Sequence, residues 1–312
     1  MKVAIIGPGA LGCLLAAKFS LAGEEVWLVD YRPERAQLLG RQGLILQAPR
    51  GTATKVKVHA GLAGEVGPAD LTILTVKAHQ TGAAVQDLPL LLSSGGLALT
   101  LQNGLGNLEE MARVAGPARL LGGASILGAT RLREGEVLLA GLGPTYVGQP
   151  PGSLVSPAEV EKVVGLFRRA GLPCEARGDI EAVLWEKFLV NVGINPLTAL
   201  LKIKNGDLPR IPPAWGLAVS AATEALAVAR ASGIELSVDP EARLREVCTA
   251  TASNRSSMLQ DVLAGRRTEI EALNAQVTTR GESHVIPTPV NHFLTQLIQA
   301  LEEAGKDYGG GG

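Results

Sequence analysis

A lysine and two asparagines recur at four-residue intervals in "WEKFLVNVGINPL", residues 185–197. The segment has helical periodicity, and a helix turns about 100° per residue, so Lys187, Asn191 and Asn195 should share an arc of about 80°. Such an ammonium could stabilise and protonate a developing oxyanion, while the amides hold a small molecule. The alternative is an ordinary solvated face. Because asparagine is a mediocre helix former, two of them on one stripe favour a binding face.

A second polar stretch, "ATASNRSSMLQD", covers residues 250–261. Asn254, Ser257 and Asp261 would share one helix face there, at spacings of three and four residues. Glu269 follows at the predicted start of the next helix. Since acids in a first turn complement the helix dipole, Glu269 taken alone favours a structural role.

Two further polar residues follow predicted strands. Lys77 lies in "TVKAHQT" and Asn103 in "LQNGLGN". Taken singly, Lys77 reads equally well as a solvated loop residue and Asn103 as a turn residue before Gly104. Together they favour a functional interpretation, because doubly wound sheets bind ligands at the carboxyl ends of their strands.

The motif "GPGALG" sets three glycines between a predicted strand, 2–7, and a predicted helix, 10–22. In this array the first glycine permits a tight turn, the second lets a pyrophosphate approach the backbone, and the third allows close helix packing. The next strand, 25–30, completes a βαβ unit, a context that makes the motif strong. The residues expected at a dinucleotide are Gly7, Pro8, Gly9, Ala10, Leu11 and Gly12.

The end of the second strand should select between NAD and NADP. Asp30 lies where an acid would accept a hydrogen bond from the ribose 2′-hydroxyl. Arg32 follows two residues later, where a guanidinium could clamp a 2′-phosphate. Asp30 favours NAD and Arg32 favours NADP, so the two residue types leave the choice of cofactor open.

The rest of the chain must position these groups. Strand patterns dominate up to about residue 178 and helical patterns follow, so we predict an α/β domain over 1–178 and an all-helical domain over 179–312. Strands are expected at 55–60, 71–76, 96–101 and 119–129, a hairpin at 137–141 and 145–148, and helices at 156–171, 179–201, 212–232, 239–263, 268–282 and from 290. The last four glycines predict a flexible tail.

Composition excludes several classes of protein. The 312 residues are 46% hydrophobic and 19% charged with a net charge of −1, which suits two folded domains and disfavours nucleic acid as a partner. Cys13, Cys174 and Cys248 are far apart and form neither a disulfide framework nor a metal pattern, so no metal is expected. No apolar run is long enough to span a membrane, and glycines break the N-terminal one, so we expect a cytoplasmic protein without a signal peptide.

Over nearly its whole length the sequence resembles the ketopantoate reductase (2-dehydropantoate 2-reductase) family. The motifs that carry the resemblance are "GPGALG", "TVKAHQT", "LQNGLGN", "WEKFLVNVGINPLTAL", "SNRSSMLQD", "RRTEIEALN" and "IPTPVN". It implies a Rossmann-type domain, then an all-α domain like the C-terminal domain of 6-phosphogluconate dehydrogenase, with the active site between them. It also implies NADPH-dependent reduction of 2-dehydropantoate to (R)-pantoate, a step toward pantothenate and coenzyme A. We expect a homodimer.

The resemblance also implies roles for individual residues. Lys187 is the implied general acid, and an unperturbed lysine, with a pKa of roughly 10.4, is charged at pH 7. Glu269 is the implied acid that contacts and helps to hold the substrate. Asn103 is placed near the nicotinamide and the reacting carbonyl, and Lys77 beside cofactor and substrate. Asn103 and Glu269 are therefore expected at the cofactor as well as at the substrate.

For the rest of the substrate, Asn191 and Asn195 are similar to amides that bind its hydroxyl end. Asn254 and Ser257 are similar to residues around its carboxylate. Arg32 is the implied ligand of the cofactor 2′-phosphate. The chain departs from the family pattern in having an acid, Asp30, just before this arginine, which leaves room for NADH.

Two rival functions share some of these features. Another two-domain 2-keto acid or opine dehydrogenase would have the glycine turn and a lysine, but should lack "NPLTAL" and "SSMLQD" together. A non-catalytic dinucleotide sensor would need neither Lys187 nor Glu269. Their joint presence argues for an enzyme.

Overall fold

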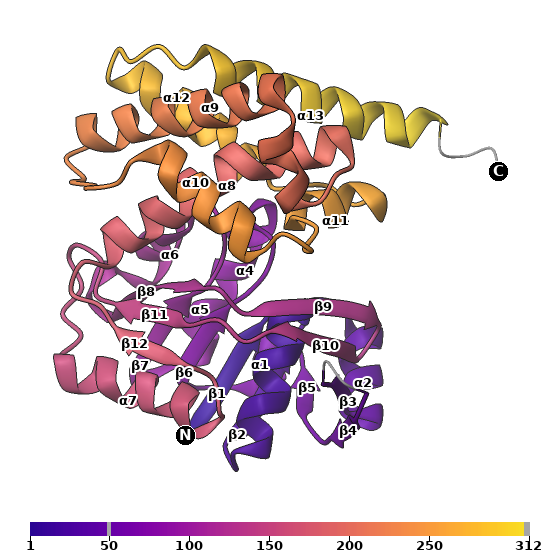
Figure 1. The fold of residues 1–312 in the computed structure, drawn as a ribbon. Helices are drawn as coiled ribbons and strands as arrows, with labels where there is room; N and C mark the ends of the chain where they lie inside the picture. Colours follow the sequence, from indigo (N-terminus) through magenta and orange to yellow (C-terminus); the bar gives the residue numbers. More distant parts are fainter. Residues whose placement is uncertain (49–50, 309–312) are drawn as a thin grey trace. The chain divides into compact units, whose positions relative to one another are not determined.

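The computed structural model describes residues 1–48 and 51–308, so the final glycines, 309–312, lie outside the described residues. The chain divides into two compact units (Figure 1). The first contains Met1–Gln102 and Asn107–Ile180, and the second contains Asn103–Gly106 and the chain from Glu181 onward. A four-residue segment of the α/β half of the sequence thus belongs to the second unit.

The first unit is built on a twisted eight-stranded sheet. Its strand order is β12-β11-β8-β7-β6-β1-β2-β5, and neighbours are parallel except β11 and β8. The central strands are apolar and buried because helices cover both faces of the sheet. The strands are β1 (Lys2–Ile6), β2 (Glu25–Val29), β5 (His59–Gly61), β6 (Ala69–Leu74), β7 (Leu92–Thr100), β8 (Leu120–Ser125), β11 (Thr145–Gly148) and β12 (Cys174–Ala176).

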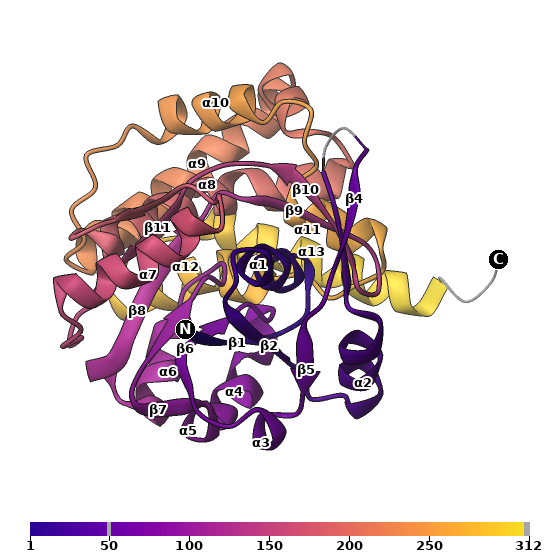
Figure 2. The same ribbon diagram turned by 90° about the horizontal axis from the view of Figure 1, so that it is seen from below.

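Helices lie on both sides of this sheet, as Figure 2 shows. On one side α1 (Ala10–Leu21) and α7 (Pro157–Arg169) meet through Phe19 and Phe167, whose ring centroids are 5.0 Å apart. The other side carries the short helices α3 (Ala63–Val66), α4 (Thr81–Ala84) and α5 (Leu88–Leu91), and α6 (Asn107–Ala115). Helix α2 (Pro33–Gln42) follows β2, and single 3-10 turns η1 (Ala78–Gln80), η2 (Val85–Asp87) and η3 (Pro117–Arg119) join other elements.

The first unit also has a smaller sheet of four strands, in the order β4-β3-β10-β9. Its strands are β3 (Leu44–Gln47), β4 (Ala53–Val56), β9 (Gly128–Arg133) and β10 (Glu136–Gly141). The predicted hairpin at 137–141 and 145–148 is wrong, because its two strands belong to different sheets. Strand β10 pairs with β9 and β3, whereas β11 pairs with β8 and β12 in the large sheet. The expected strands 55–60 and 119–129 likewise each divide between the two sheets. Sequence periodicity finds extended segments but not the partners that they pair with, which depend on distant residues.

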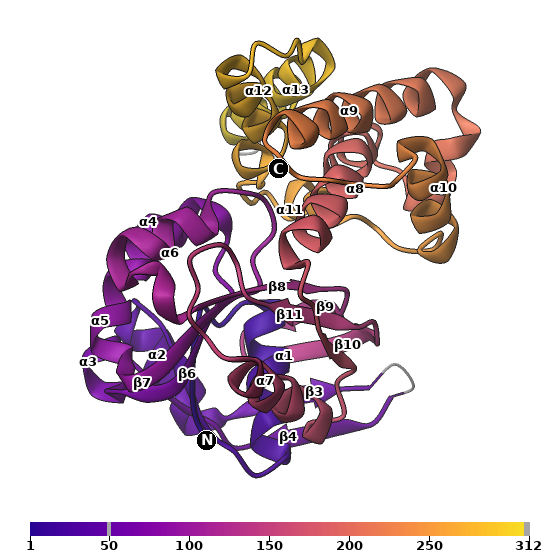
Figure 3. The same ribbon diagram turned by 90° about the vertical axis from the view of Figure 1, so that its left-hand side faces the viewer.

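The second unit is helical. Its elements are α8 (Ile180–Leu201), η4 (Asn205–Arg210), α9 (Pro212–Ala231), α10 (Pro240–Ala250), α11 (Ser257–Leu263), η5 (Ile270–Ala272), α12 (Asn274–Ser283) and α13 (Pro289–Tyr308) (Figure 3). Apolar residues of α8, α9, α12 and α13 share one buried core. The predicted order, an α/β part followed by a helical part, is confirmed.

Two predicted helices are wrong in extent. The segment 239–263 contains two helices, because the chain turns after Ala250 and Ser256 starts α11 by accepting a hydrogen bond from Leu259 N at 3.1 Å. The segment 268–282 begins with the 3-10 turn η5, and α12 starts only at Asn274. Within residues 1–48 and 51–308, the structure contains no helix of the length and apolarity needed to cross a membrane.

Candidate functional site

The glycine turn has the close contacts that its sequence predicts. Gly7 has a φ of +101°, and Gly9 N donates to Gly7 O at 2.8 Å. A Cβ on Gly12 would lie 2.1 Å from Gly7 O, so only glycine lets α1 pack on the turn. A Cβ on Gly9 would meet no described atom within 4 Å, so the backbone there is open to a ligand.

The first turn of α1 is prepared to receive an anion. Gly9 is the N-cap of α1 and makes no side-chain hydrogen bond to the first turn, which contains no acidic residue. The N–H groups at a helix start point outward with the positive end of the helix dipole and bind phosphates well. Helix start, open Gly9 and tight Gly12 together fit the pyrophosphate of a dinucleotide.

Thr75, which was not predicted as a site residue, holds this turn. Its Oγ1 lies 3.1 Å from Ile6 O and 2.9 Å from Gly7 O, so the hydroxyl can donate to either carbonyl oxygen. Thr75 follows β6 directly, and β6 pairs in register with β1. A hydroxyl residue directly after a strand that neighbours the glycine turn is the signal that could have identified it.

The end of β2 carries a buried ion pair. Asp30 is 4% exposed, and both of its carboxylate oxygens are bound by Arg35, with Arg35 Nη2 donating to Oδ1 at 2.7 Å and Arg35 Nε donating to Oδ2. Arg32 N also donates to Oδ1, at 3.2 Å, while the Arg32 side chain is exposed. The residue types of Asp30 and Arg32 gave no sign of Arg35, which lies in the first turn of α2.

Lys77 lies at the same edge of the sheet. Ile6 pairs with Leu74, and Leu74 with Thr100, so the loops after β1, β6 and β7 leave the sheet side by side. Lys77 is half-buried and precedes η1, and Lys77 O accepts from Gln80 N at 2.8 Å. The buried Gln102, also missed, donates from Nε2 to Val76 O at 3.0 Å and so fixes the loop that carries Lys77.

In the second unit, Asn103 is brought to Glu269. Leu105 N donates to Ala272 O at 3.1 Å, and Gly104, with a φ of +84°, lies so close that a Cβ would be 2.4 Å from Ala272 O. Asn103 Nδ2 then lies 3.4 Å from Glu269 Oε2. Glu269 is 6% exposed and precedes η5, so it does not open a regular helix as expected.

Lys187 lies close enough to Glu269 for the two charges to interact. It lies on α8 and is partly buried. Burial lowers the pKa of its ammonium to about 8, and the negative charge of Glu269 opposes part of that shift. Asn195 on the same stripe is buried and Asn191 is half-buried, so this stripe is not a plain solvated face. Glu186, beside Lys187, pairs instead with Arg243 of α10 at 2.7 Å.

The stretch 250–261 is arranged differently from the prediction. Asn254 is exposed in the turn before α11, so it does not share a helix face with Ser257 and Asp261. The reason is local: Ser256 caps α11 and ends the helical path through Asn254. Ser257 is the first residue of α11, and Ser256 Oγ accepts from Thr198 Oγ1 of α8 at 2.7 Å. That bond ties the start of α11 to the helix of Asn195.

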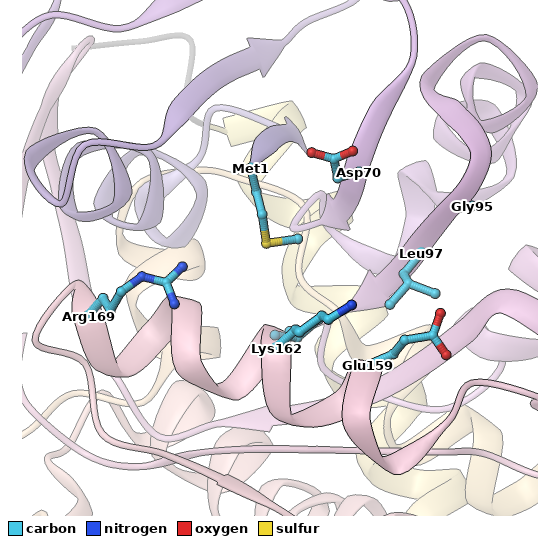
Figure 4. Close-up of a pocket in the computed structure, with 8 residues that line it drawn as sticks. Met1, Asp70, Gly95, Leu97, Glu159, Lys162 and Arg169 are labelled. Atoms are coloured by element: carbon cyan, nitrogen blue, oxygen red, sulfur yellow. The ribbon is translucent and has the colours of Figure 1, made fainter.

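A separate cavity of about 390 Å³ lies in the first unit (Figure 4). Its lining includes Met1, Asp70 and Lys162, and it lies at the amino end of β1. The glycine turn follows the carboxyl end of that strand, so this cavity lies at the opposite end of β1 from the glycine turn.

The cysteines and acids form no metal centre within residues 1–48 and 51–308. All three cysteines are buried, and burial raises the pKa of Cys13 to about 12. Cys13 is therefore an uncharged packing residue behind the glycine turn, as its position in the sequence indicates.

The chain combines a Rossmann-type unit, which has an open glycine turn, with a helical unit that carries a lysine, a carboxylate and amides. This is the architecture of dinucleotide-dependent dehydrogenases. Residues 3–152 match the family model "Ketopantoate reductase PanE/ApbA", and residues 179–302 match "Ketopantoate reductase PanE/ApbA C terminal". The chain belongs to the ketopantoate reductase family, which confirms the resemblance.

Relatives match over nearly the full length. The chain is 37% identical to a 2-dehydropantoate 2-reductase of Archaeoglobus fulgidus over 96% of this chain and 98% of that protein. A ketopantoate reductase structure from Ralstonia eutropha is 29% identical with a TM-score of 0.88, covering 98% of this chain and 100% of its own. A D-mandelate dehydrogenase structure with NADH and anilino(oxo)acetate is 26% identical with a TM-score of 0.89, covering 97% and 99%.

Proposed function

We propose that this protein reduces 2-dehydropantoate to (R)-pantoate with NADPH, a step toward pantothenate and coenzyme A. One observation carries the proposal: Lys187, with its lowered pKa, shares a helix stripe with Asn191 and Asn195 and is influenced by the charge of Glu269. An acid, its neighbouring carboxylate and two amides are the groups that a small hydroxylated 2-keto acid requires. The segment 1–178 is the proposed cofactor-binding domain, and 179–312 the proposed substrate and catalytic domain.

Lys187 is the proposed general acid. When bound, the nicotinamide supplies a hydride to the keto carbon. Negative charge then develops on the carbonyl oxygen, and the Lys187 ammonium stabilises this charge and donates a proton to it. With a pKa of about 8, Lys187 is mostly protonated at pH 7, yet it is a stronger acid than an ordinary lysine. Glu269 raises that pKa and keeps the ammonium charged in a partly desolvated place.

The amides and hydroxyls hold the substrate. Asn191 and Asn195 project from the Lys187 stripe and are the proposed partners of the hydroxyl end. Asn254 and Ser257, near the start of α11, are the proposed partners of the carboxylate. Asn103 is the proposed contact of the nicotinamide and the carbonyl, with its amide directed toward Glu269.

The first unit supplies the cofactor site. The turn formed by residues 7–12 is the proposed pyrophosphate site, with Lys77 beside the nicotinamide end, and Asn103 and Glu269 are proposed to contact the cofactor as well. Arg35 engages both oxygens of Asp30, so that carboxylate has little capacity left for a ribose 2′-hydroxyl. Asp30, Arg32 and Arg35 together carry one net positive charge, which favours a 2′-phosphate and therefore NADPH.

A second candidate is the reduction of another 2-keto acid with NADH. It is favoured by the likeness to D-mandelate dehydrogenase, whose structure contains NADH and anilino(oxo)acetate. The two candidates share hydride transfer to a 2-keto acid, and they differ in the side chain of the substrate and in the cofactor.

The test is reduced-nicotinamide oxidation with purified protein, measured by absorbance for NADPH and NADH. The substrates are 2-dehydropantoate, 2-oxoisovalerate, which lacks the hydroxymethyl group, and phenylglyoxylate. We expect the highest kcat/KM for 2-dehydropantoate with NADPH. Higher kcat/KM for phenylglyoxylate with NADH would favour the second candidate, and no turnover of any substrate would refute both.

Lys187→Ala tests the chemical role in the same assay. Loss of a general acid costs about 100-fold or more in kcat. NADPH binding, followed by its fluorescence, should survive because the glycine turn belongs to the first unit. Unchanged kcat in this variant would refute the proposed mechanism.

The protein is also proposed to be a cytoplasmic homodimer. Phe293 and Leu297, four residues apart on α13, are 63% and 53% exposed and form an apolar strip. Contiguous exposed apolar surface marks many protein contacts, so this strip is the proposed dimer contact.

A further inference from the structure

Helix α8 has a proline in its interior, beside the residues proposed to hold the substrate. Pro196 follows Asn195 directly. A proline has no N–H, so the carbonyl four residues earlier, that of Val192, lacks its ordinary helical donor. Val192 is fully buried, and a buried carbonyl without a donor costs stability.

The missing donor comes from another helix. Asn274, the first residue of α12, is fully buried, and its Nδ2 donates to Val192 O at 3.0 Å. The same Nδ2 donates to Asn291 Oδ1 at 2.9 Å. Val192 O and Asn291 Oδ1 are both hydrogen-bond acceptors, so the amide nitrogen of Asn274, and not its oxygen, must face them. Within the described residues, Asn274 Oδ1 has no hydrogen-bond partner, so the amide acts here through its donor end.

Asn274 is itself held by a buried chain of hydrogen bonds. Asn291 Nδ2 donates to Ala221 O at 3.0 Å and to Glu224 Oε2 at 2.7 Å. Glu224 of α9 also accepts from Val290 N and Asn291 N, which are first-turn donors of α13. Asn274 therefore joins α8 to a framework made by α9, α12 and α13.

The same short segment fixes the other half of the candidate site. Ala272 O, two residues before Asn274, accepts from Leu105 N and holds the loop of Asn103. Glu269 lies three residues further back and is within 3.4 Å of that asparagine amide. One continuous segment thus positions Asn103 and Glu269 through its backbone and the proline region of α8 through Asn274.

We propose that Asn274 is a positioning residue for substrate binding, acting by supplying the hydrogen bond that Pro196 removes from α8. It sets where Asn191 and Asn195 lie relative to Glu269. This inference rests on the proposed reduction of a 2-keto acid, and it assigns Asn274 no contact with substrate.

A double-mutant cycle tests the inference: Asn274→Leu, Pro196→Ala, and both together. Leucine keeps the branched shape of the side chain and removes the donor. Alanine in place of Pro196 restores a backbone N–H for Val192 O. With Pro196 retained, Asn274→Leu should raise KM for 2-dehydropantoate about tenfold or more, with a smaller change in kcat. In the Pro196→Ala background the same change should raise KM by only about threefold or less.

The controls separate positioning from stability. The Kd of NADPH should stay within about twofold in every variant, because the glycine turn is in the other unit and the backbone bond from Leu105 N to Ala272 O, which holds Asn103 near Glu269, is not altered. Thr295→Val removes another buried hydrogen bond, from Thr295 Oγ1 to Asn291 O at 2.9 Å, and should leave KM unchanged. Thermal unfolding of each variant confirms that the protein assayed is folded.

The outcomes are distinct. Equal KM effects of Asn274→Leu in both backgrounds would overturn the inference, as would a fall in melting temperature with KM unchanged. Failure of the unmutated protein to reduce any 2-keto acid would refute the proposed function itself, and this is seen before any variant is compared.

Discussion

At the scale of single residues, the properties of Lys187 and Asp30 in the candidate site depend on their oppositely charged neighbours. Burial lowers the pKa of Lys187 to about 8, and the charge of Glu269 limits the fall. Arg35 binds both oxygens of Asp30, so we propose that this carboxylate takes no part in cofactor selection. Glu269 is distant from Lys187 in sequence and Arg35 is five residues from Asp30, and each effect can be tested by removing that neighbour.

The first residue-scale prediction concerns pH. Lys187 must be protonated to act as an acid, so kcat/KM for reduction should fall as pH rises through about 8. Glu269 raises the pKa of Lys187, so Glu269→Gln should move this basic limb to lower pH. A pH profile of kcat/KM measures both effects. A limb that stays in place in the variant would exclude an influence of Glu269 on the acid.

Removal of Arg35 should change the preference for NADPH over NADH. Arg35→Gln removes one positive charge and releases the Asp30 carboxylate, which can then accept from a ribose 2′-hydroxyl. We expect the ratio of kcat/KM for NADPH to that for NADH to fall about tenfold or more. Arg41→Gln, a change of the same kind at the other end of α2, is the matched control. An unchanged ratio in Arg35→Gln would mean that Arg32 alone selects the phosphate.

At the scale of elements, the turn between β1 and α1 separates two uses of glycine. Gly12 is needed by the fold, because a Cβ would overlap Gly7 O. A Cβ on Gly9 would meet nothing that the structure describes, so the fold does not require glycine there, and we propose that the ligand does. Their sequence motif is the same, and only their surroundings distinguish them.

Two alanine variants test whether Gly12 is required for stability and Gly9 for cofactor binding. Gly12→Ala should lower the free energy of unfolding by about 1–3 kcal/mol or more, as overpacking does. Gly9→Ala should leave the melting temperature nearly unchanged but weaken NADPH binding, since the methyl group occupies the pyrophosphate position. Thermal unfolding and fluorescence titration measure the two effects. Equal loss of stability in both variants would contradict the assignment of Gly9 to the ligand.

At the scale of the whole molecule, the apolar strip of α13 is the candidate dimer contact. Phe293→Glu places a charge in that strip and should reduce the mass measured by light scattering from twice the chain mass of 32.4 kDa to that of one chain. Gln37→Glu, at an exposed position of α2, is the control for added charge. A single-chain mass for the unmutated protein would refute the homodimer.

The sequence predicted the helix starts at Ser156 and Asp239 because both caps are local. Ser156 Oγ accepts from Glu159 N, and Asp239 Oδ1 accepts from Glu241 N, within three residues. The hairpin at 137–148 was wrong because β10 and β11 take partners from β3, β8, β9 and β12. The roles of Arg35 and Asn274 were missed because neither residue type is unusual in its local context.

Local residue spacing was enough to predict the βαβ unit, its glycine turn, the Lys187 stripe and the change from strands to helices near residue 178. Folding of the whole chain was needed to reveal the pairing of Asp30 with Arg35, the approach of Asn103 to Glu269, and the bond from Asn274 to Val192 across the helical core. The last two join residues 166 and 82 positions apart. Such contacts form only when separate elements pack, and no local periodicity records them.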